Sequence, residues 1–259
     1  MKKHAIALSI LLVLLSLPVI ISCSEQTTFN NTSNATDVYE FSVRPGMPEW
    51  ASFTSHTEMV EACQIPESIL QDMSTAGLVE TVLNYPLAID IWAFGSTQTG
   101  FGAIIYEFNG IRELLSREDA ATELIKKYCS LDITIVNESW ALGSIAEFTL
   151  GKVAFIEIIL AQDEIISKMT EGEKRELIAE ALAKYDQKGQ HSDVYGAIDQ
   201  MYTMWIMARV LYQENYAPFM QKVEESEELQ YFIDGGTSIC FDVSDEIISA
   251  AQEFLSQAQ

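Results

Sequence analysis

Positive charge is scarce in this chain. It has 15 Lys and Arg residues against 38 Asp and Glu, which gives a formal net charge of −23. Proteins bind nucleic acid largely through Lys and Arg on phosphate, so we expect no nucleic-acid partner. Apolar residues make up 48% of the chain, which is enough to form a substantial core and excludes wholesale disorder.

Histidine and cysteine are also few, with three and four copies. Beyond the N-terminal apolar run only His56 and His191 remain, too far apart for an H-E-x-x-H or Cys/His zinc pattern. No serine lies in a G-x-S-x-G motif. Gly100-Phe-Gly102 lacks the third glycine and the lysine of a nucleotide loop, so we interpret it as a close packing point between helices. We therefore expect no metal, no cofactor and no recognisable catalytic residue.

The N-terminus carries the most specific motif. A short basic stretch, Met1-Lys-Lys-His4, precedes an apolar run of 17 residues from Ala5 to Ile21. This run is short for a membrane-spanning helix, and its flanks are those of a secretory signal. Ile20-Ile21-Ser22-Cys23 resembles a bacterial lipobox, which implies cleavage after residues 1–22 and lipidation of Cys23. The alternative is an ordinary secretory signal in which Cys23 is incidental.

Two further features bear on localisation. Ser24 rather than Asp follows the cysteine, which in the lipoproteins that this motif resembles disfavours retention at the inner membrane. Residues 24–37 are polar, with Phe29 as the single large apolar side chain, so we predict a flexible tether over residues 23–45. We expect a protein of the bacterial cell envelope that reaches the membrane through its N-terminal lipid, at the outer membrane.

The remainder of the chain has helical spacing and helical punctuation. Ser or Thr followed three residues later by Asp or Glu predicts helix starts at Ser55, Ser116 and Thr170, and Ser74 and Ser244 also precede helical patterns. The segment 131–136 alternates and can be one extended crossover. We predict an all-α domain over residues 46–259, an array of packed antiparallel helical pairs with a candidate boundary between two halves near 131–152.

Two predicted helices are strongly apolar. In 152–169, a helical projection places Glu157, Ala161, Glu164 and Lys168 on one narrow stripe, which favours a solvated face over a buried catalytic acid. In 193–214, Asp199 and Thr203 mark the polar side, and the remaining circumference is apolar, as in a central or interface helix. The apolar face of this helix contains Ile198, Met201, Tyr202, Trp205, Arg209 and Tyr212.

Arg209 has two interpretations on this apolar face. It can be a neutralised core arginine, paired with a carboxylate or stacked on Trp205 or Tyr212, or it can face a ligand. Trp205, Arg209 and Tyr212 are therefore the candidate contacts for a ligand or partner. Just before this helix, His191-Ser192-Asp193 fits a helix start with Ser192 as its N-cap better than a working His–carboxylate pair.

Three cysteines remain once Cys23 is assigned to the lipid. Because Cys63, Cys129 and Cys240 are an odd number, at most one disulfide can form, and its pairing cannot be deduced from sequence.

About a third of the chain resembles a known group of proteins. The blocks CQIPE, MST, LNYP and FNGIREL, within residues 47–128, are similar to those of uncharacterised predicted lipoproteins of Bacteroides-type gut bacteria. The resemblance implies an envelope location and a helical fold. It implies no activity, cofactor or site residue.

Two functional hypotheses follow. The first is a non-enzymatic helical module that binds a protein or peptide in the envelope, with the acidic surface favouring a basic partner. The second is an envelope hydrolase, directed at glycans or peptides, with an unrecognised carboxylate or His site lined by Trp50, Trp92, Trp140 or Trp205. Two carboxylates facing each other across a polar cleft would favour the hydrolase.

Overall fold

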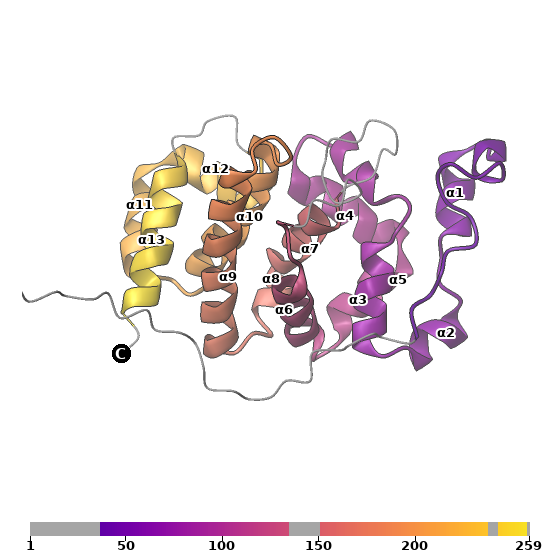
Figure 1. The fold of residues 1–259 in the computed structure, drawn as a ribbon, viewed down its shortest axis with the longest axis horizontal. Coiled ribbons are helices and arrows are strands. Elements are labelled where there is room, and N and C mark those ends of the chain that lie inside the picture. Colours follow the sequence, from indigo (N-terminus) through magenta and orange to yellow (C-terminus); the bar gives the residue numbers. More distant parts are fainter. Residues whose placement is uncertain (1–36, 135–150, 238–242, 258–259) are drawn as a thin grey trace, which may run out of the picture. The chain divides into compact units, whose positions relative to one another are not determined.

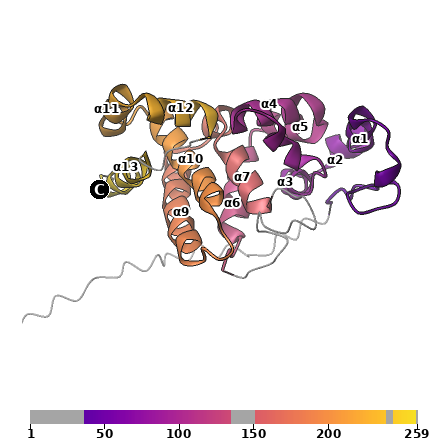
Figure 2. The same ribbon diagram turned by 90° about the horizontal axis from the view of Figure 1, so that it is seen from above.

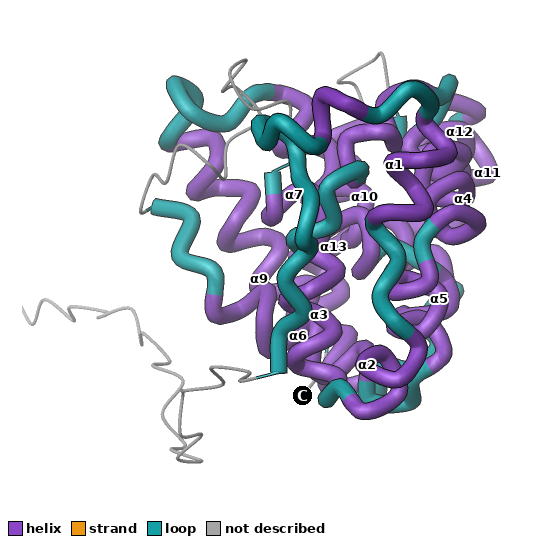
Figure 3. Tube along the Cα trace, turned by 90° about the vertical axis from the view of Figure 1, so that its right-hand side faces the viewer, coloured by secondary structure: helices purple, strands orange, loops and turns teal. Residues whose placement is uncertain are grey.

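Helices and the loops between them account for the described chain. The structure is a computed structural model that describes residues 37–134, 151–237 and 243–257. No strand occurs in these ranges (Figure 3), which confirms the all-α class. Leu131 has extended backbone angles and residues 133–134 form a turn, while residues 135–136 of the predicted crossover lie outside the described residues.

The elements up to α8 have at most 11 residues, and the two longest helices, α9 and α10, follow them. The first group consists of η1 (Trp50–Ser52), α1 (His56–Ala62), α2 (Glu67–Asp72), α3 (Thr75–Leu83), η2 (Ala88–Ala93), α4 (Thr97–Glu107), α5 (Asn109–Ser116), α6 (Ala120–Ser130), α7 (Lys152–Leu160) and α8 (Asp163–Ile166). The second group consists of α9 (Glu171–Gln190), α10 (Ala197–Gln213), α11 (Ala217–Glu225), α12 (Glu227–Gly235) and α13 (Ser244–Ser256).

Helix α10 is the centre of the packing. It runs beside α9, to which a short turn joins it, and it also contacts α7, α12 and α13 (Figure 1). Every residue from Tyr202 to Leu211 is buried. The helix is apolar over nearly its whole circumference because other helices surround it. Helix α12 also packs against α4 (Figure 2), which brings two segments far apart in sequence together.

Local capping signals placed most of the helix starts correctly. The Ser55 side chain accepts from the Glu58 N–H, Ser74 accepts from the Gly77 N–H, and Thr170 and Glu173 form a complete capping box. The predicted cap at Ser116 is wrong. Helix α6 begins after Asp119, whose carboxylate instead accepts from the Thr75 hydroxyl at 2.7 Å, while Ser116 bonds back to its own helix.

The predicted tether is too long at its C-terminal end. The Asp37 carboxylate accepts from the Ser74 N–H and hydroxyl at 2.6 and 2.9 Å, and the Tyr39 N–H donates to Thr81 Oγ1 at 2.9 Å. Phe41 is buried against the Tyr85 and Phe108 rings. Residues 37–41 therefore belong to the folded domain.

No division of the domain is visible near residues 131–152. Residues 135–150 lie outside the described ranges, but α6 and α7 on either side of them pack together. Buried residues from both sides, such as Leu124 and Ile158, share one core. None of the described helices has the length and apolarity that crossing a membrane requires.

Candidate functional site

A recess of about 310 Å³ opens on the surface where η2, the start of α4 and the start of α10 meet. Its lining is mostly apolar and hydroxyl-bearing. It consists of Ile91, Trp92, Phe94, Gly95, Ser96, Thr97, Ile198, Met201, Tyr202 and Thr237.

Large apolar side chains at the rim of this recess are exposed. Trp92, Phe94 and Ile198 have exposed fractions of 41%, 44% and 54%. In the described ranges the other exposed large hydrophobic residues, Ile69, Tyr106 and Tyr231, do not line it. Clustered exposed apolar residues around a hollow are typical of interaction sites.

Hydrogen bonds hold the walls of the recess. The Trp92 indole N–H donates to the Tyr202 hydroxyl at 2.9 Å, joining η2 to α10. The Thr97 hydroxyl donates to the Gly236 carbonyl at 2.9 Å, and the Thr97 N–H donates to Thr237 Oγ1 at 3.2 Å, joining α4 to the end of α12. Four elements, η2, α4, α10 and the end of α12, are therefore bonded to one another around the recess.

Gly100 sets the distance between η2 and α4. A Cβ at this position would lie 2.1 Å from the Ile91 carbonyl oxygen, which no side chain can occupy. The interpretation of Gly100-Phe-Gly102 as a close packing point is confirmed for Gly100. Gly102 has open space around it.

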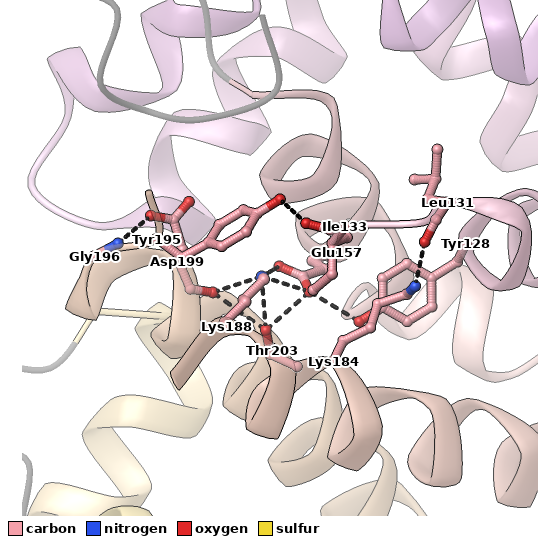
Figure 4. A network of polar contacts seen from close by, with 10 residues as sticks. All are labelled: Tyr128, Leu131, Ile133, Glu157, Lys184, Lys188, Tyr195, Gly196, Asp199 and Thr203. Carbon is pink, nitrogen blue, oxygen red and sulfur yellow. Dashed lines mark hydrogen bonds and ion pairs between the residues drawn. The ribbon is translucent and has the colours of Figure 1, made fainter. Parts of the chain in front are cut away.

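A network of polar side chains lies inside the domain, apart from the recess (Figure 4). The Glu157 carboxylate accepts from Lys188 Nζ at 2.7 and 2.8 Å, from the Tyr128 hydroxyl at 2.8 Å and from the Thr203 hydroxyl at 2.9 Å. Lys188 Nζ also lies 2.9 Å from the Asp199 carbonyl oxygen. The Glu157 and Lys188 side chains have no exposed surface.

The predicted solvated stripe is therefore wrong at Glu157 and Ala161, which are both fully buried. The projection assumed one continuous helix, but α7 ends at Leu160 and α8 begins at Asp163. Helices α3, α6 and α10 also surround α7, which leaves no solvated face at Glu157. Glu164 is exposed as predicted, and Lys168 is partly exposed.

This cluster is built for cohesion rather than catalysis. Both Glu157 oxygens are occupied, and the Lys188 ammonium group has acceptors for all its protons. Burial, and then the charge of Glu157, raises the pKa of the Tyr128 hydroxyl well above its ordinary value, so it stays a donor. A buried pair in which every polar atom is satisfied fixes how α6, α7, α9 and α10 pack.

The polar side assigned to the central helix is also buried. Thr203 and Asp199 have exposed fractions of 0% and 4%, whereas Ile198, assigned to the apolar face, is exposed. Asp199 Oδ2 accepts from the Gly196 N–H at 2.9 Å, which caps α10. Burial raises the pKa of the Asp199 carboxyl to about 6, against the lowering effects of Lys188 and of this hydrogen bond.

None of the three predicted ligand contacts lines the recess. Trp205 is fully buried and its indole N–H donates to the Ile233 carbonyl at 2.9 Å. Arg209 donates to the Ala161 carbonyl at 3.0 Å, pairs with Asp163 at 2.9 Å and lies 5.8 Å from the Trp205 ring. Tyr212 is partly buried. Their role as ligand contacts stays a prediction.

The remaining candidate residues from the sequence lie at separate places in the structure or outside the described residues. His191 is the C-cap of α9 and α10 starts at Ala197, so the predicted Ser192 cap is wrong. Cys63 is a buried free thiol and Cys129 an exposed one. Cys23, Trp140 and Cys240 lie outside the described residues.

Sequence reasoning missed both the recess and the partner of Glu157. The buried residues of α9 include Leu177, Ala181, Lys184 and Lys188, which succeed one another at spacings of four, three and four. This spacing places both lysines on the buried face of the helix. That spacing was the available signal. Nothing in the sequence distinguishes Trp92 and Phe94 from core aromatic residues.

Comparison with protein-family models, curated proteins and solved structures finds no match to this chain.

Proposed function

We propose that this chain is a lipid-anchored protein of the bacterial envelope that binds a protein or peptide segment in the recess between η2, α4 and α10. The observation that carries the binding proposal is the cluster of Trp92, Phe94 and Ile198, exposed around one fixed hollow. Exposed apolar surface costs free energy unless something covers it.

The size of the recess suits a small anchor. Its volume of about 310 Å³ lies at the lower end of the range of roughly 300–1,000 Å³ found for ligand pockets. One or two apolar side chains of a partner would fill it, with Tyr202 and Thr97 at its polar edge. Hot spots at protein interfaces are commonly single large side chains seated in such pockets.

Charge defines the rest of the partner. The net charge of −23 favours encounter with a basic segment. Asp234 is exposed on α12, three residues before the lining residue Thr237. We therefore expect a segment with an apolar anchor flanked by Lys or Arg.

Selection from a random displayed-peptide library against the full chain in detergent tests this proposal. We expect enrichment of apolar residues flanked by basic ones, and at least a tenfold increase in Kd for Ile198→Asp. Ile69→Asp is the matched control, because Ile69 is also exposed, at 41%, lies outside the recess and adds the same charge. Equal binding by Ile198→Asp and the parent would refute the assignment.

The hydrolase alternative receives no support from this recess. It requires two carboxylates facing each other across a cleft, and none of the residues that line the recess carries a carboxylate.

The lipid anchor is proposed from the lipobox ending at Cys23 and from the basic and apolar segments before it.

A further inference from the structure

Three elements bring a histidine and two carboxylates together away from the recess. His56 on α1, Asp90 on η2 and Glu107 at the end of α4 each place a ligand atom within 4.8 Å of the other two. His56 Nε2 lies 2.7 Å from Asp90 Oδ2. His56 is exposed, and both acidic residues are partly buried.

The backbone around this cluster is pinned. Asn109, next to the end of α4, accepts from the Ile65 N–H at 3.0 Å and donates to the Ile65 carbonyl at 2.7 Å. Gln64 Nε2 donates to the Glu107 carbonyl at 2.9 Å. These bonds tie the chain that follows α1 to the α4–α5 junction, and the contact of Gly100 with Ile91 fixes η2 on α4. The segments that carry Asp90 and Glu107 therefore have a defined spacing, and the contact of His56 with Asp90 joins the start of α1 to them.

A buried hydroxyl supplies an independent indication of a ligand. Tyr85 is 4% exposed and its hydroxyl has no hydrogen-bond partner within the described part of the chain. Its ring stacks on Phe108, the residue after Glu107, with centroids 4.0 Å apart. Burial mainly, and then the charges of Cys63, Glu107 and Asp90, raises the pKa of this hydroxyl, so it lies within electrostatic reach of both carboxylates. A buried polar group without a partner calls for an explanation, and solvent ordered around an ion held by Asp90 and Glu107 would supply one.

We propose that His56, Asp90 and Glu107 bind a divalent transition-metal ion, for which Zn²⁺ is the probe. One imidazole nitrogen and two carboxylate oxygens suit Zn²⁺ or Mn²⁺ better than Ca²⁺ or Mg²⁺, which prefer oxygen alone. Zinc bonds of about 2.0–2.2 Å place tetrahedral ligands roughly 3.4 Å apart, which side-chain rotation reaches from the observed spacing. No metal site was expected from sequence. The three ligands proposed here are separated by 34 and 17 residues along the chain, so no short sequence motif contains them.

The test is calorimetric titration of the EDTA-treated full chain in detergent with ZnCl₂, together with its melting temperature. We expect one Zn²⁺ per chain, a higher Tm with zinc, and at least a tenfold weaker affinity in His56→Ala, Asp90→Asn and Glu107→Gln. His191→Ala is the control for histidine loss and should bind as the parent does.

Cobalt substitution provides a second readout. We expect visible bands of Co²⁺ bound by nitrogen and oxygen, without the thiolate charge-transfer band that coordination by Cys63 would give. Absence of zinc binding at 100-fold excess over the protein, or unchanged affinity in His56→Ala, would overturn the site. Neither result bears on the recess, whose test uses different residues.

Discussion

At the scale of single residues, Lys188 shows how one buried charge organises its surroundings. Its ammonium group contacts Glu157, Thr203 and the Asp199 carbonyl, with no access to water. Such a pair is weak evidence of net stabilisation, because desolvation offsets most of the Coulomb attraction, but removing one partner leaves the other charge buried and unpaired.

Lys188→Met should therefore lower the free energy of unfolding by about 3–5 kcal/mol. Denaturant unfolding measures the change. Lys126→Met is the matched control, because Lys126 pairs with Glu123 at 2.7 Å but is 52% exposed, and should cost less than about 1 kcal/mol. The double variant Glu157→Leu/Lys188→Met should recover part of the loss. A loss in Lys188→Met no larger than in the control would contradict the account.

Asp199 gives a prediction for pH. Its carboxyl has a pKa of about 6 in the folded protein, above the ordinary value of 3.8, so the folded state binds the proton more tightly. The stability from this group is fully present below about pH 4 and is lost as pH rises through 6.

The free energy of unfolding of Asp199→Asn, minus that of the parent, should thus rise by about 1–3 kcal/mol between pH 4 and 7.5. Asparagine retains an acceptor for the Gly196 N–H. Urea titrations of both proteins across this range measure the difference. A difference independent of pH would show that Asp199 does not titrate in this window.

At the scale of elements, the contact between η2 and α4 depends on one missing Cβ. In Gly100→Ala the methyl group would meet the Ile91 carbonyl, so η2 must move away from α4 and the bond from Trp92 to Tyr202 must be disturbed. We expect a loss of stability of about 2 kcal/mol or more.

Gly102→Ala provides the control on the same helix. Its Cβ would have nothing within 4 Å, so it should stabilise α4 by about 0.5–1 kcal/mol. Thermal unfolding distinguishes the two substitutions, and tryptophan fluorescence should change only in Gly100→Ala. Two variants of equal stability would show that the close approach is unimportant.

Elements were predictable from sequence where the signal is local. Ser55, Ser74 and Thr170 bond to N–H groups three residues away, so a short pattern contains the whole interaction. The Asp119 carboxylate instead accepts a hydrogen bond from Thr75, 44 residues earlier in the chain. The Glu157 carboxylate accepts one from Lys188, 31 residues later. Partners at such separations exist only once the helices are packed, and so do the recess and the His56 cluster.

At the scale of the whole molecule, the proposed anchor and the folded domain should be independent. Cys23→Ala should move the protein from the membrane fraction to the soluble fraction with an unchanged melting temperature, because the described domain begins at residue 37, after Cys23. Cys129→Ala, at an exposed free thiol, is the control and should remain with membranes. Retention of Cys23→Ala in the membrane fraction would refute lipid anchoring.

Cys63 offers a consequence of a different kind. It is fully buried directly after α1, and burial, with the charge of Asp90 adding to it, raises the pKa of its thiol to about 12. No residue of α1 itself is buried, so this end of the domain should detach more readily than the helices around α10. The rate of alkylation of Cys63 would then report how often α1 detaches from the domain while the other helices stay folded. A metal ion joining His56 to Asp90 and Glu107 would lower this rate of alkylation.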